Sequence, residues 1–507
     1  MLRSKPFHAF VFGLATLLAL LGVWIVTGDQ IPALRGPAPY PVSWMWSYAP
    51  LDLGTSRVWS WLGALALYVV VAIVLLWRLQ RQQLRIGWLL AWATLAMIGL
   101  PILQTLTREQ SLRDTLIFRT YSPVLNGYFV APAQMKDPVA ALSDYLTVMP
   151  TFFSDRPQTH PPGLYLFYLV VNGFFERQAD FSHWFSTIAR TWAVEGRDWI
   201  GLPDGLVTSA FFSACLQLLL VALSPLAAYA WASQLTYRNG DQRSQTVASW
   251  LAVALPLIAP TSAFFLQWDI NYLPPTLFAW ALALRADRQD QQDEMDGTMF
   301  WRGTRWLRWL WPGLLLSLLT WLSFGNSVTA AMIGLHLLLR QQRFRLRLLA
   351  GGAVMLVGVL LPWLLAYWAW RMNGIAVMQL AIRRHYEVVT SSRDYNVWLW
   401  MNGVDLALWL GPAILVLGLL ASIVLWVRWR TNRDLAALAF SFWSLLLLLD
   451  LSGTSRAEVG RLWIFLMPYP LFLALLYAEN LFYRALLLGL MALWMGGVGY
   501  AIAAIVT

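Results

Sequence analysis

Long apolar runs recur along the whole chain and constrain its fold more than any other feature. Examples are residues 8–27, 58–77, 347–369, 404–427 and 483–506. A helix needs roughly 20 predominantly apolar residues to cross the hydrocarbon core of a bilayer. Hydrophobic residues make up 59% of the chain and charged residues only 12%, whereas soluble domains carry about 25% charged residues. The sequence therefore predicts an all-α, polytopic membrane protein.

The basic residues sort by membrane side when the N-terminus is placed in the cytoplasm and the sides alternate. Arginine clusters at 78–85, 340–347 and 428–433 then lie in the cytoplasm. Cytoplasmic segments hold more than half of the 36 basic residues but under a third of the 26 acids, as the positive-inside rule requires. About thirteen transmembrane helices are expected, near 8–27, 58–77, 86–105, 206–234, 245–265, 270–285, 309–324, 327–340, 348–369, 404–427, 435–450, 461–478 and 484–506.

One apolar segment, residues 161–175, is too short to span a bilayer, and counting it as a span would invert everything downstream. We expect it to form a helix that lies in, or dips into, the outer interface. The chain then divides into three transmembrane helices (1–105), a large extracytoplasmic loop with interfacial helices (106–205) and a transmembrane core (206–507). The C-terminus falls on the extracytoplasmic side.

Net charge and cysteine content exclude two classes of protein. The net charge of +10 would fit a nucleic-acid partner, but the basic residues gather on one membrane side, so no nucleic-acid partner is expected. The single cysteine, Cys215, excludes an intrachain disulfide framework and a cysteine-based metal cluster. A divalent metal held by carboxylates stays open, although no spacing demands one, and no other cofactor is indicated.

The predicted outer loops carry the polar residues that are unusual for a simple membrane anchor. Polar groups beside a bilayer are costly unless paired or hydrated, so such clusters suggest a function. They include Asp155 and His160 at the end of the large loop, Asp269 between Trp268 and Asn271 at the mouth of a helix, and Arg456, Glu458 and Arg461 before a helix. The outer candidates with a proposed role are Arg119, Asn126, Tyr128, Asp155, His160, Trp268, Asp269, Asn271, Arg384, His385, Arg456, Glu458, Arg461 and Trp463, and the same loops also carry Arg156 and Arg383.

Each candidate also has a structural interpretation. His160 precedes two prolines and could only shape a turn. Asp269 could cap the helix that follows it. Glu458 and the arginines around it could seat a helix by ordinary ion pairs, and Asp137 is expected to cap a loop helix. His336, in the middle of a predicted span, is expected to form a hydrogen bond to another helix.

Two short motifs resemble a known superfamily. The large outer loop ends in Thr159-His160-Pro161-Pro162-Gly163 and is followed by an apolar interfacial helix and a long span. The tail carries Gly453-Thr454-Ser455-Arg456-Ala457-Glu458-Val459-Gly460-Arg461-Leu462-Trp463. Together they resemble the GT-C glycosyltransferases, in the branch of the protein mannosyltransferases and aminoarabinose transferases, which often carries a His-Pro-Pro-Leu-type segment here. The likeness covers roughly residues 106–480, and residues 1–105 add a hairpin.

The resemblance implies a membrane glycosyltransferase that moves a sugar, with inversion, from a polyprenyl-phosphate lipid to a glycan, lipid or protein acceptor outside the cytoplasm. A carboxylate would activate the acceptor hydroxyl, and arginines would hold the phosphate. The catalytic candidates are Asp155, His160 and Asp269. The donor-phosphate candidates are Arg119, Arg384, Arg456, Glu458 and Arg461, and the substrate-binding candidates are Asn126, Tyr128, Trp268, Asn271, His385 and Trp463.

One departure from the family pattern keeps other functions open. Members place an acid soon after the helix that precedes the large loop, but residues 119–129 contain none; Asp114 lies upstream, and Asp137, Asp144 and Asp155 lie downstream. A non-catalytic relative is therefore one alternative, and a lipid or polysaccharide transporter or flippase is another. An O-antigen ligase or polymerase fits less well, because its large loop comes late in the chain. The expected location is a bacterial plasma membrane.

Overall fold

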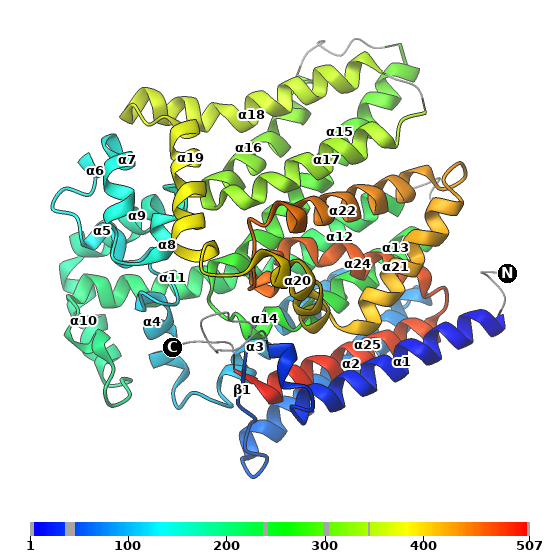
Figure 1. The fold of residues 1–507 in the computed structure, drawn as a ribbon, viewed down its shortest axis with the longest axis horizontal. Helices are drawn as coiled ribbons and strands as arrows, with labels where there is room; N and C mark the ends of the chain where they lie inside the picture. Colours follow the sequence, from blue (N-terminus) through cyan, green and yellow to red (C-terminus); the bar gives the residue numbers. More distant parts are fainter. Residues whose placement is uncertain (1–4, 36–45, 237–241, 298–303, 343–344, 504–507) are drawn as a thin grey trace.

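The computed structural model describes residues 5–35, 46–236, 242–297, 304–342 and 345–503. The fold is 79% helical, which confirms the all-α prediction. One short antiparallel pair joins the two ends of the chain, with β1 (Ser47–Tyr48) against β2 (Ile502–Ala503) in the register Ser47 to Ala503 and Tyr48 to Ile502. The helices form one elongated bundle whose long axis most of them follow (Figure 1).

Among the described residues, seven helices are long and apolar enough to cross a membrane, and an eighth span would be a bent pair. The chain is thus a multi-pass membrane protein by the length and composition of its helices. The seven are α1 (Lys5–Thr27), α2 (Ser56–Gln80), α3 (Ile86–Thr105), α11 (Asp204–Ala222) continued by α12 (Ser224–Thr236), α18 (Leu346–Trp370), α22 (Arg433–Ser452) and α25 (Leu481–Ala501). The bent pair is α20 (Tyr395–Leu410) and α21 (Pro412–Val427).

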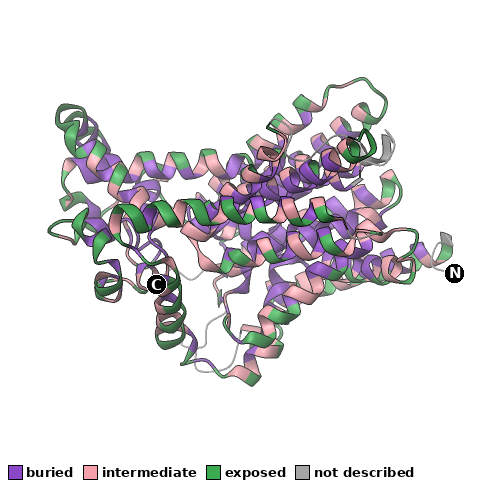
Figure 2. Ribbon diagram, turned by 90° about the horizontal axis from the view of Figure 1, so that it is seen from above, coloured by how far each residue is buried: buried purple, intermediate pink, exposed green. Residues whose placement is uncertain are grey.

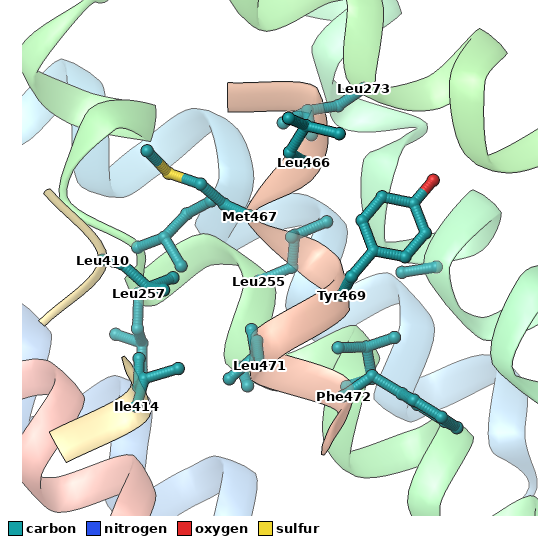
Figure 3. Close-up of a cluster of buried hydrophobic side chains, with 14 of the residues drawn as sticks. Leu255, Leu257, Leu273, Leu410, Ile414, Leu466, Met467, Tyr469, Leu471 and Phe472 are labelled. Carbon is teal, nitrogen blue, oxygen red and sulfur yellow. The ribbon is translucent and has the colours of Figure 1, made fainter. Parts of the chain in front are cut away.

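The other predicted spans are shorter or more polar, so the count of thirteen is not established. They correspond to α13 (Gln242–Ala254), α15 (Leu273–Met295), α16 (Leu307–Leu322), α17 (Ser327–Leu339) and α24 (Pro468–Tyr477). Nearly every residue of α24 is buried, as expected of a helix that is apolar all round. Figure 3 shows its side chains Tyr469, Leu471 and Phe472 packed among leucines from other helices.

Prolines and a glycine interrupt three predicted spans, so the continuous helices expected at 245–265, 404–427 and 461–478 are corrected. The first ends at Ala254, followed by η4 (Leu255–Leu257) and α14 (Pro260–Ala263), because proline lacks the N–H that a helix needs. The second bends by 107° where Gly411, at φ 93°, meets Pro412. The third divides into α23 (Val459–Leu462), η8 (Ile464–Leu466) and α24.

Helix α15 continues ten residues beyond the end predicted at residue 285, so that boundary was wrong. The extension is polar, but its acids have partners on other helices. Asp287 lies 3.7 Å from Arg340 and forms a second ion pair with Arg345, and the indole of Trp309 donates to Asp290 at 2.6 Å. Tertiary ion pairs therefore extend a helix that local composition would end.

The expected interhelical hydrogen bond of His336 is confirmed. Its Nε2 lies 2.9 Å from a carboxylate oxygen of Asp434, which joins α17 to α22. The side chain of Asp137 accepts the backbone N–H groups of Val139 and Ala140 at 3.1 and 2.9 Å, so its predicted capping role is also confirmed.

The large predicted loop gathers at one end of the bundle, at the left of Figure 1, opposite the start of α1. The helix predicted at 161–175 is α9 (Gly163–Arg177). The other helices of this loop are α4 (Leu112–Tyr121), α5 (Val130–Ala133), α6 (Ala140–Ser143), α7 (Tyr145–Val148), η2 (Met149–Thr151), α8 (Asp155–Gln158), α10 (Ala179–Arg190) and η3 (Asp198–Gly201).

Several short elements complete the fold. They are η1 (Pro32–Arg35), η5 (Trp268–Tyr272), η6 (Phe324–Asn326), α19 (Gly374–His385) and the π-helix η7 (Tyr386–Thr390). Burial follows the bundle: its inner faces are buried, and exposed residues lie along the outer helices and at the loop end (Figure 2). The N-terminal helix α1 packs against α21 and α25, so the first and last thirds of the chain share one core.

Candidate functional site

An ionic cluster forms where η5 meets the segment before α24. We define it as Asp269, Arg393, Glu458, Arg461 and the nearby Arg156. Arg461 Nη1 lies 3.4 Å from Asp269 Oδ2, and its Nη2 donates to the Glu458 carboxylate. Arg393 Nη2 donates to the other Glu458 oxygen at 2.8 Å. The pair of Arg461 and Asp269 thus joins residues 192 positions apart in the sequence.

Electrostatics keep Glu458 and Arg461 charged. Burial alone would raise the pKa of Glu458, but the guanidinium groups of Arg461 and Arg393 outweigh it and hold that pKa well below its usual range. Burial would lower the pKa of Arg461, but Glu458 and Asp269 outweigh it and raise that pKa. Each of these charges therefore depends on its neighbours in the cluster.

Arg156 differs from the other arginines of the cluster because it lacks a direct partner. Among the described residues, no carboxylate or carbonyl accepts a hydrogen bond from its guanidinium. Burial lowers its pKa, and the like charge of Arg461 lowers it further, while Asp269 and Glu458 act in the opposite sense. Arg156 is only partly exposed, and a partly desolvated cation without a paired anion is unfavourable, so this position favours an anionic ligand.

His160 lies beside Arg156 at the end of α8. Its Nδ1 lies 2.8 Å from the backbone carbonyl oxygen of Arg156, which can only accept, so Nδ1 carries the proton and Nε2 has the free lone pair. The ring of Tyr128 meets the imidazole edge-on, with centroids 5.3 Å apart. Burial lowers the pKa of His160 to about 3, and His385, Arg461 and Arg156 add to the shift. The imidazole is therefore neutral at physiological pH.

The motif around His160 has a packing role as well. Pro162 is the N-cap of α9, and Gly163 is its first residue. A Cβ added to Gly163 would lie 2.2 Å from the backbone oxygen of Trp321 at the end of α16. The motif therefore lets α9 approach α16 closely, and this packing holds His160 at the cluster.

Two buried tyrosines border the cluster. Burial raises the pKa of Tyr128 and of Tyr272, and the negative charge of Asp269 adds to both shifts. Both phenols are therefore protonated. No described residue forms a hydrogen bond with either phenol oxygen, so both hydroxyl groups are available as donors.

Two predicted substrate-binding residues instead support the site from behind. Asn126 Nδ2 donates to the hydroxyl of Tyr168 at 2.7 Å, and the indole of Trp268 donates to the same oxygen at 2.9 Å. Asn126 and Trp268 thereby fix the position of η5, which carries Asp269. The predicted capping role of Asp269 is wrong, because the N-cap of α15 is Tyr272 and the Asp269 side chain faces Arg461.

Two of the arginines predicted to bind the donor phosphate instead donate hydrogen bonds to backbone carbonyl oxygens. Arg456 Nη1 donates to the carbonyl oxygens of Thr390 and Arg393 at 3.2 and 2.6 Å. Arg119 donates to the carbonyl oxygen of Phe265 at 3.3 Å and lies 3.9 Å from Glu109. Neither guanidinium is free in this arrangement.

Arg384 and His385 connect α19 to the two sides of the site. Arg384 donates to Glu387 at 2.8 Å and to the side-chain oxygen of Gln158 on α8. His385 Nε2 lies 3.0 Å from the carbonyl oxygen of Thr454. Burial lowers the pKa of His385, although the hydrogen bond to Thr454 opposes the shift.

The remaining predicted residues lie apart from the ion pairs. Asp155 opens α8 with an exposed side chain that forms no hydrogen bond to the cluster among the described residues. Asn271 is buried in η5, and its side-chain oxygen has no partner there. Trp463 is buried in the core, with its indole N–H unpaired in the described part of the chain. The carboxylate of the upstream acid Asp114 accepts hydrogen bonds from Arg197 and from the indole of Trp199, each at 2.9 Å.

Sequence reasoning placed Arg156 in the outer loop but gave it no role, and it missed Tyr272 and Arg393. Arg156 lies four residues before His160, a spacing that places both on one side of a helical turn and could have revealed it. Tyr272 follows Asp269 in the same short helix. Arg393 carries no local signal, because only the folded chain brings it to Glu458.

The described residues contain no group of three His, Cys, Asp or Glu side chains placed to hold a metal. In the cluster, both carboxylates face arginines. A divalent metal therefore has no evident set of ligands among these residues.

Comparisons with models of protein families, with curated proteins and with solved structures found no match to this chain. The functional argument therefore depends on the geometry of the ionic cluster.

Proposed function

We propose that the chain is a glycosyltransferase that moves a sugar from a polyprenyl-phosphate lipid to an acceptor outside the cytoplasm. The single observation that carries the proposal is Arg156, a partly exposed guanidinium that has no carboxylate partner among the described residues and lies beside Arg461. A phosphodiester carries one negative charge and has oxygens that match the forked geometry of a guanidinium. Such a group would complete the charge balance of the cluster.

The leaving group explains why two arginines converge. As the bond between the sugar C1 and the phosphate oxygen breaks, its electron pair leaves on the phosphate, and negative charge develops there. Fixed guanidinium groups in a site that excludes water stabilise such charge without reorganising. Arg156 and Arg461 fit that role, whereas Arg456 and Arg119 are bound to backbone carbonyls.

Asp269 is the base that we propose for the acceptor. The acceptor hydroxyl oxygen attacks C1 from the face opposite the phosphate, and its proton passes to the carboxylate, so the configuration inverts. His160 is a weaker candidate, because burial lowers its pKa to about 3 and leaves a poor proton acceptor. The exposed side chain of Asp155 forms no hydrogen bond or ion pair with the cluster among the described residues. His160 and the two tyrosine hydroxyls are suited to binding sugar or acceptor hydroxyls.

The membrane arrangement is part of the proposal. We place about thirteen spans in a bacterial plasma membrane, with the N-terminus in the cytoplasm and the ionic cluster on the other side. The clustering of the large loop at the end opposite the start of α1 supports this topology (Figure 1). The acceptor would be a glycan, a lipid or a protein.

The test uses the full chain in lipid nanodiscs with polyprenyl-phosphate mannose, glucose and aminoarabinose as donors and a bacterial envelope extract as the source of acceptor, followed by mass spectrometry of the released polyprenyl phosphate. Asp269→Asn is expected to lower release by about 10²–10⁴-fold, the usual contribution of a general base. Arg156→Gln is expected to weaken donor binding. Arg383→Gln is the control, because Arg383 is exposed and 4.0 Å from its nearest acid.

Other outcomes would identify the alternatives. Donor binding that depends on Arg156, without any release of polyprenyl phosphate, would favour a non-catalytic relative. Translocation of a labelled lipid without sugar transfer would contradict the proposal and favour a transporter or flippase.

A further inference from the structure

The segment that presents Glu458 and Arg461 has an unusual backbone. Gly453 has φ 62°, Ala457 has φ 70° and Glu458 has φ 60°. Glycine adopts this left-handed region readily, but residues with a Cβ do so at a cost and need support from their surroundings. Two consecutive left-handed residues therefore indicate that neighbouring groups hold the turn in place.

Asn402 on α20 bonds to both sides of this turn. Its Nδ2 donates to the carbonyl oxygen of Ser455 at 2.8 Å and to Asp450 Oδ1 at 2.9 Å. Its Oδ1 accepts the backbone N–H of Ala457 at 3.0 Å. One amide side chain thus satisfies a backbone donor and a backbone acceptor that the left-handed turn leaves unpaired.

Asp405 continues the same contact one helical turn later. It is 0% exposed, and its Oδ2 accepts the backbone N–H of Val459 at 2.9 Å. Trp409 lies a further turn along, and a Cβ added to Gly460 would fall 2.1 Å from its Cδ1. Asn402, Asp405 and Trp409 therefore form one face of α20 against which the turn is pressed.

We infer that Asn402 and Asp405 are positioning residues. They hold residues 455–460 in the left-handed turn, which directs Glu458 to Arg393 and Arg461 to Asp269. Their hydrogen bonds reach backbone groups of the turn and Asp450, not the arginines of the cluster. As far as it concerns ligand binding, the inference rests on the proposed function, in which Arg461 holds the donor phosphate.

The first test measures the turn itself and needs no ligand. Hydrogen exchange at the amides of Ala457 and Val459 is followed by mass spectrometry in wild-type protein, Asn402→Ala and Asp405→Ala. Each variant removes the acceptor of one amide, so its exchange is expected to rise at least about tenfold, the effect of losing roughly 1.4 kcal/mol of protection. Asn396→Ala is the control, because Asn396 is exposed on the same helix. Unchanged exchange in both variants would overturn the inference.

The second test asks whether the turn positions the site. Binding of a C55 polyprenyl monophosphate in nanodiscs is expected to weaken at least about tenfold in Asn402→Ala and Asp405→Ala. Asp405→Asn keeps an oxygen acceptor and should restore part of the affinity. Ala457→Gly in the Asn402→Ala background should also restore affinity, because glycine adopts the left-handed turn without support.

The two tests separate the two failures. If wild-type protein binds the probe and the variants bind it equally well despite faster exchange, the positioning role is wrong. If wild-type protein does not bind the probe at all, the proposed function fails, and the exchange data alone decide whether α20 holds the turn. If an alanine variant does not fold, Asp405→Asn and Ala457→Gly alone are measured in its place. Both keep the turn supported, so both should bind the probe more tightly than Asn402→Ala is predicted to bind it.

Discussion

Arg461 faces two carboxylates, those of Glu458 and Asp269, whereas Arg156 faces none directly. Arg461 is therefore neutralised by carboxylates within the protein, whereas the charge of Arg156 is available to an anionic ligand. Neither property is visible in the sequence, where all arginines look alike. The sequence did select Asp269, Glu458, Arg461 and His160 for the outer site, and the folded chain brings all four together.

The first prediction at this scale concerns Glu458, which lies between two guanidinium groups. Glu458→Gln removes the only charge that faces both Arg393 and Arg461 among the described residues. Breaking a buried pair from one side costs about 3–5 kcal/mol, with a smaller loss expected here because the side chain is 17% exposed. Unfolding in detergent by guanidinium chloride measures it. Glu387→Gln is the control, since this 45% exposed acid should cost below about 1 kcal/mol.

The second prediction concerns pH. The pKa of His160 is about 3 in the folded chain, against about 6.5 when unfolded. The unfolded state therefore binds the extra proton first, and stability is complete above the unfolded pKa and falls as pH drops towards the folded one. Wild-type protein should lose up to about 1 kcal/mol more than His160→Asn between pH 6.5 and 5.5, since the ring is partly exposed.

Thermal unfolding across that pH range measures the difference. Arg156, Arg461, Tyr128 and His385 face His160 and are the same in both proteins, so their effects largely cancel. Parallel curves for the two proteins would contradict a neutral His160 whose pKa is lowered in the folded chain.

At the scale of elements, close approach of backbone and rings fixes the site. Gly460 touches the ring of Trp409, so Gly460→Ala must displace either the turn or α20. We expect a loss of about 1–3 kcal/mol, as for other overpacked sites, together with weaker probe binding. Gly403→Ala on the same helix has open space around it and should be neutral or stabilising. Equal stability of the two variants would contradict tight packing of the turn.

The positions of the helices were largely predictable from the sequence, but the breaks within three of the predicted spans were not predicted. Apolar length placed α1, α2, α3, α18 and α25 within a few residues. The breaks at Pro256, Pro260 and Gly411-Pro412 carry a local signal that the apolar pattern hid. The extension of α15 and the place of Arg393 depend on partners far away in sequence, and no local pattern contains that information.

At the scale of the whole molecule, the account requires the ionic cluster and the arginine-rich hairpins to lie on opposite membrane sides. In a Cys215→Ser background, Ser392→Cys beside the cluster should react with a membrane-impermeant maleimide in intact cells. Gln83→Cys, in the exposed hairpin between α2 and α3, should react only after permeabilisation. Labelling of both from the same side would contradict the topology.

The central claim is that Arg156 and Arg461 together bind the phosphate of a polyprenyl lipid. An experimental density map of the full chain in nanodiscs with C55 polyprenyl monophosphate tests it most directly. The account predicts phosphate density within hydrogen-bond reach of both guanidinium groups, which disappears in Arg156→Gln. Phosphate bound elsewhere, or bound unchanged in that variant, would contradict it.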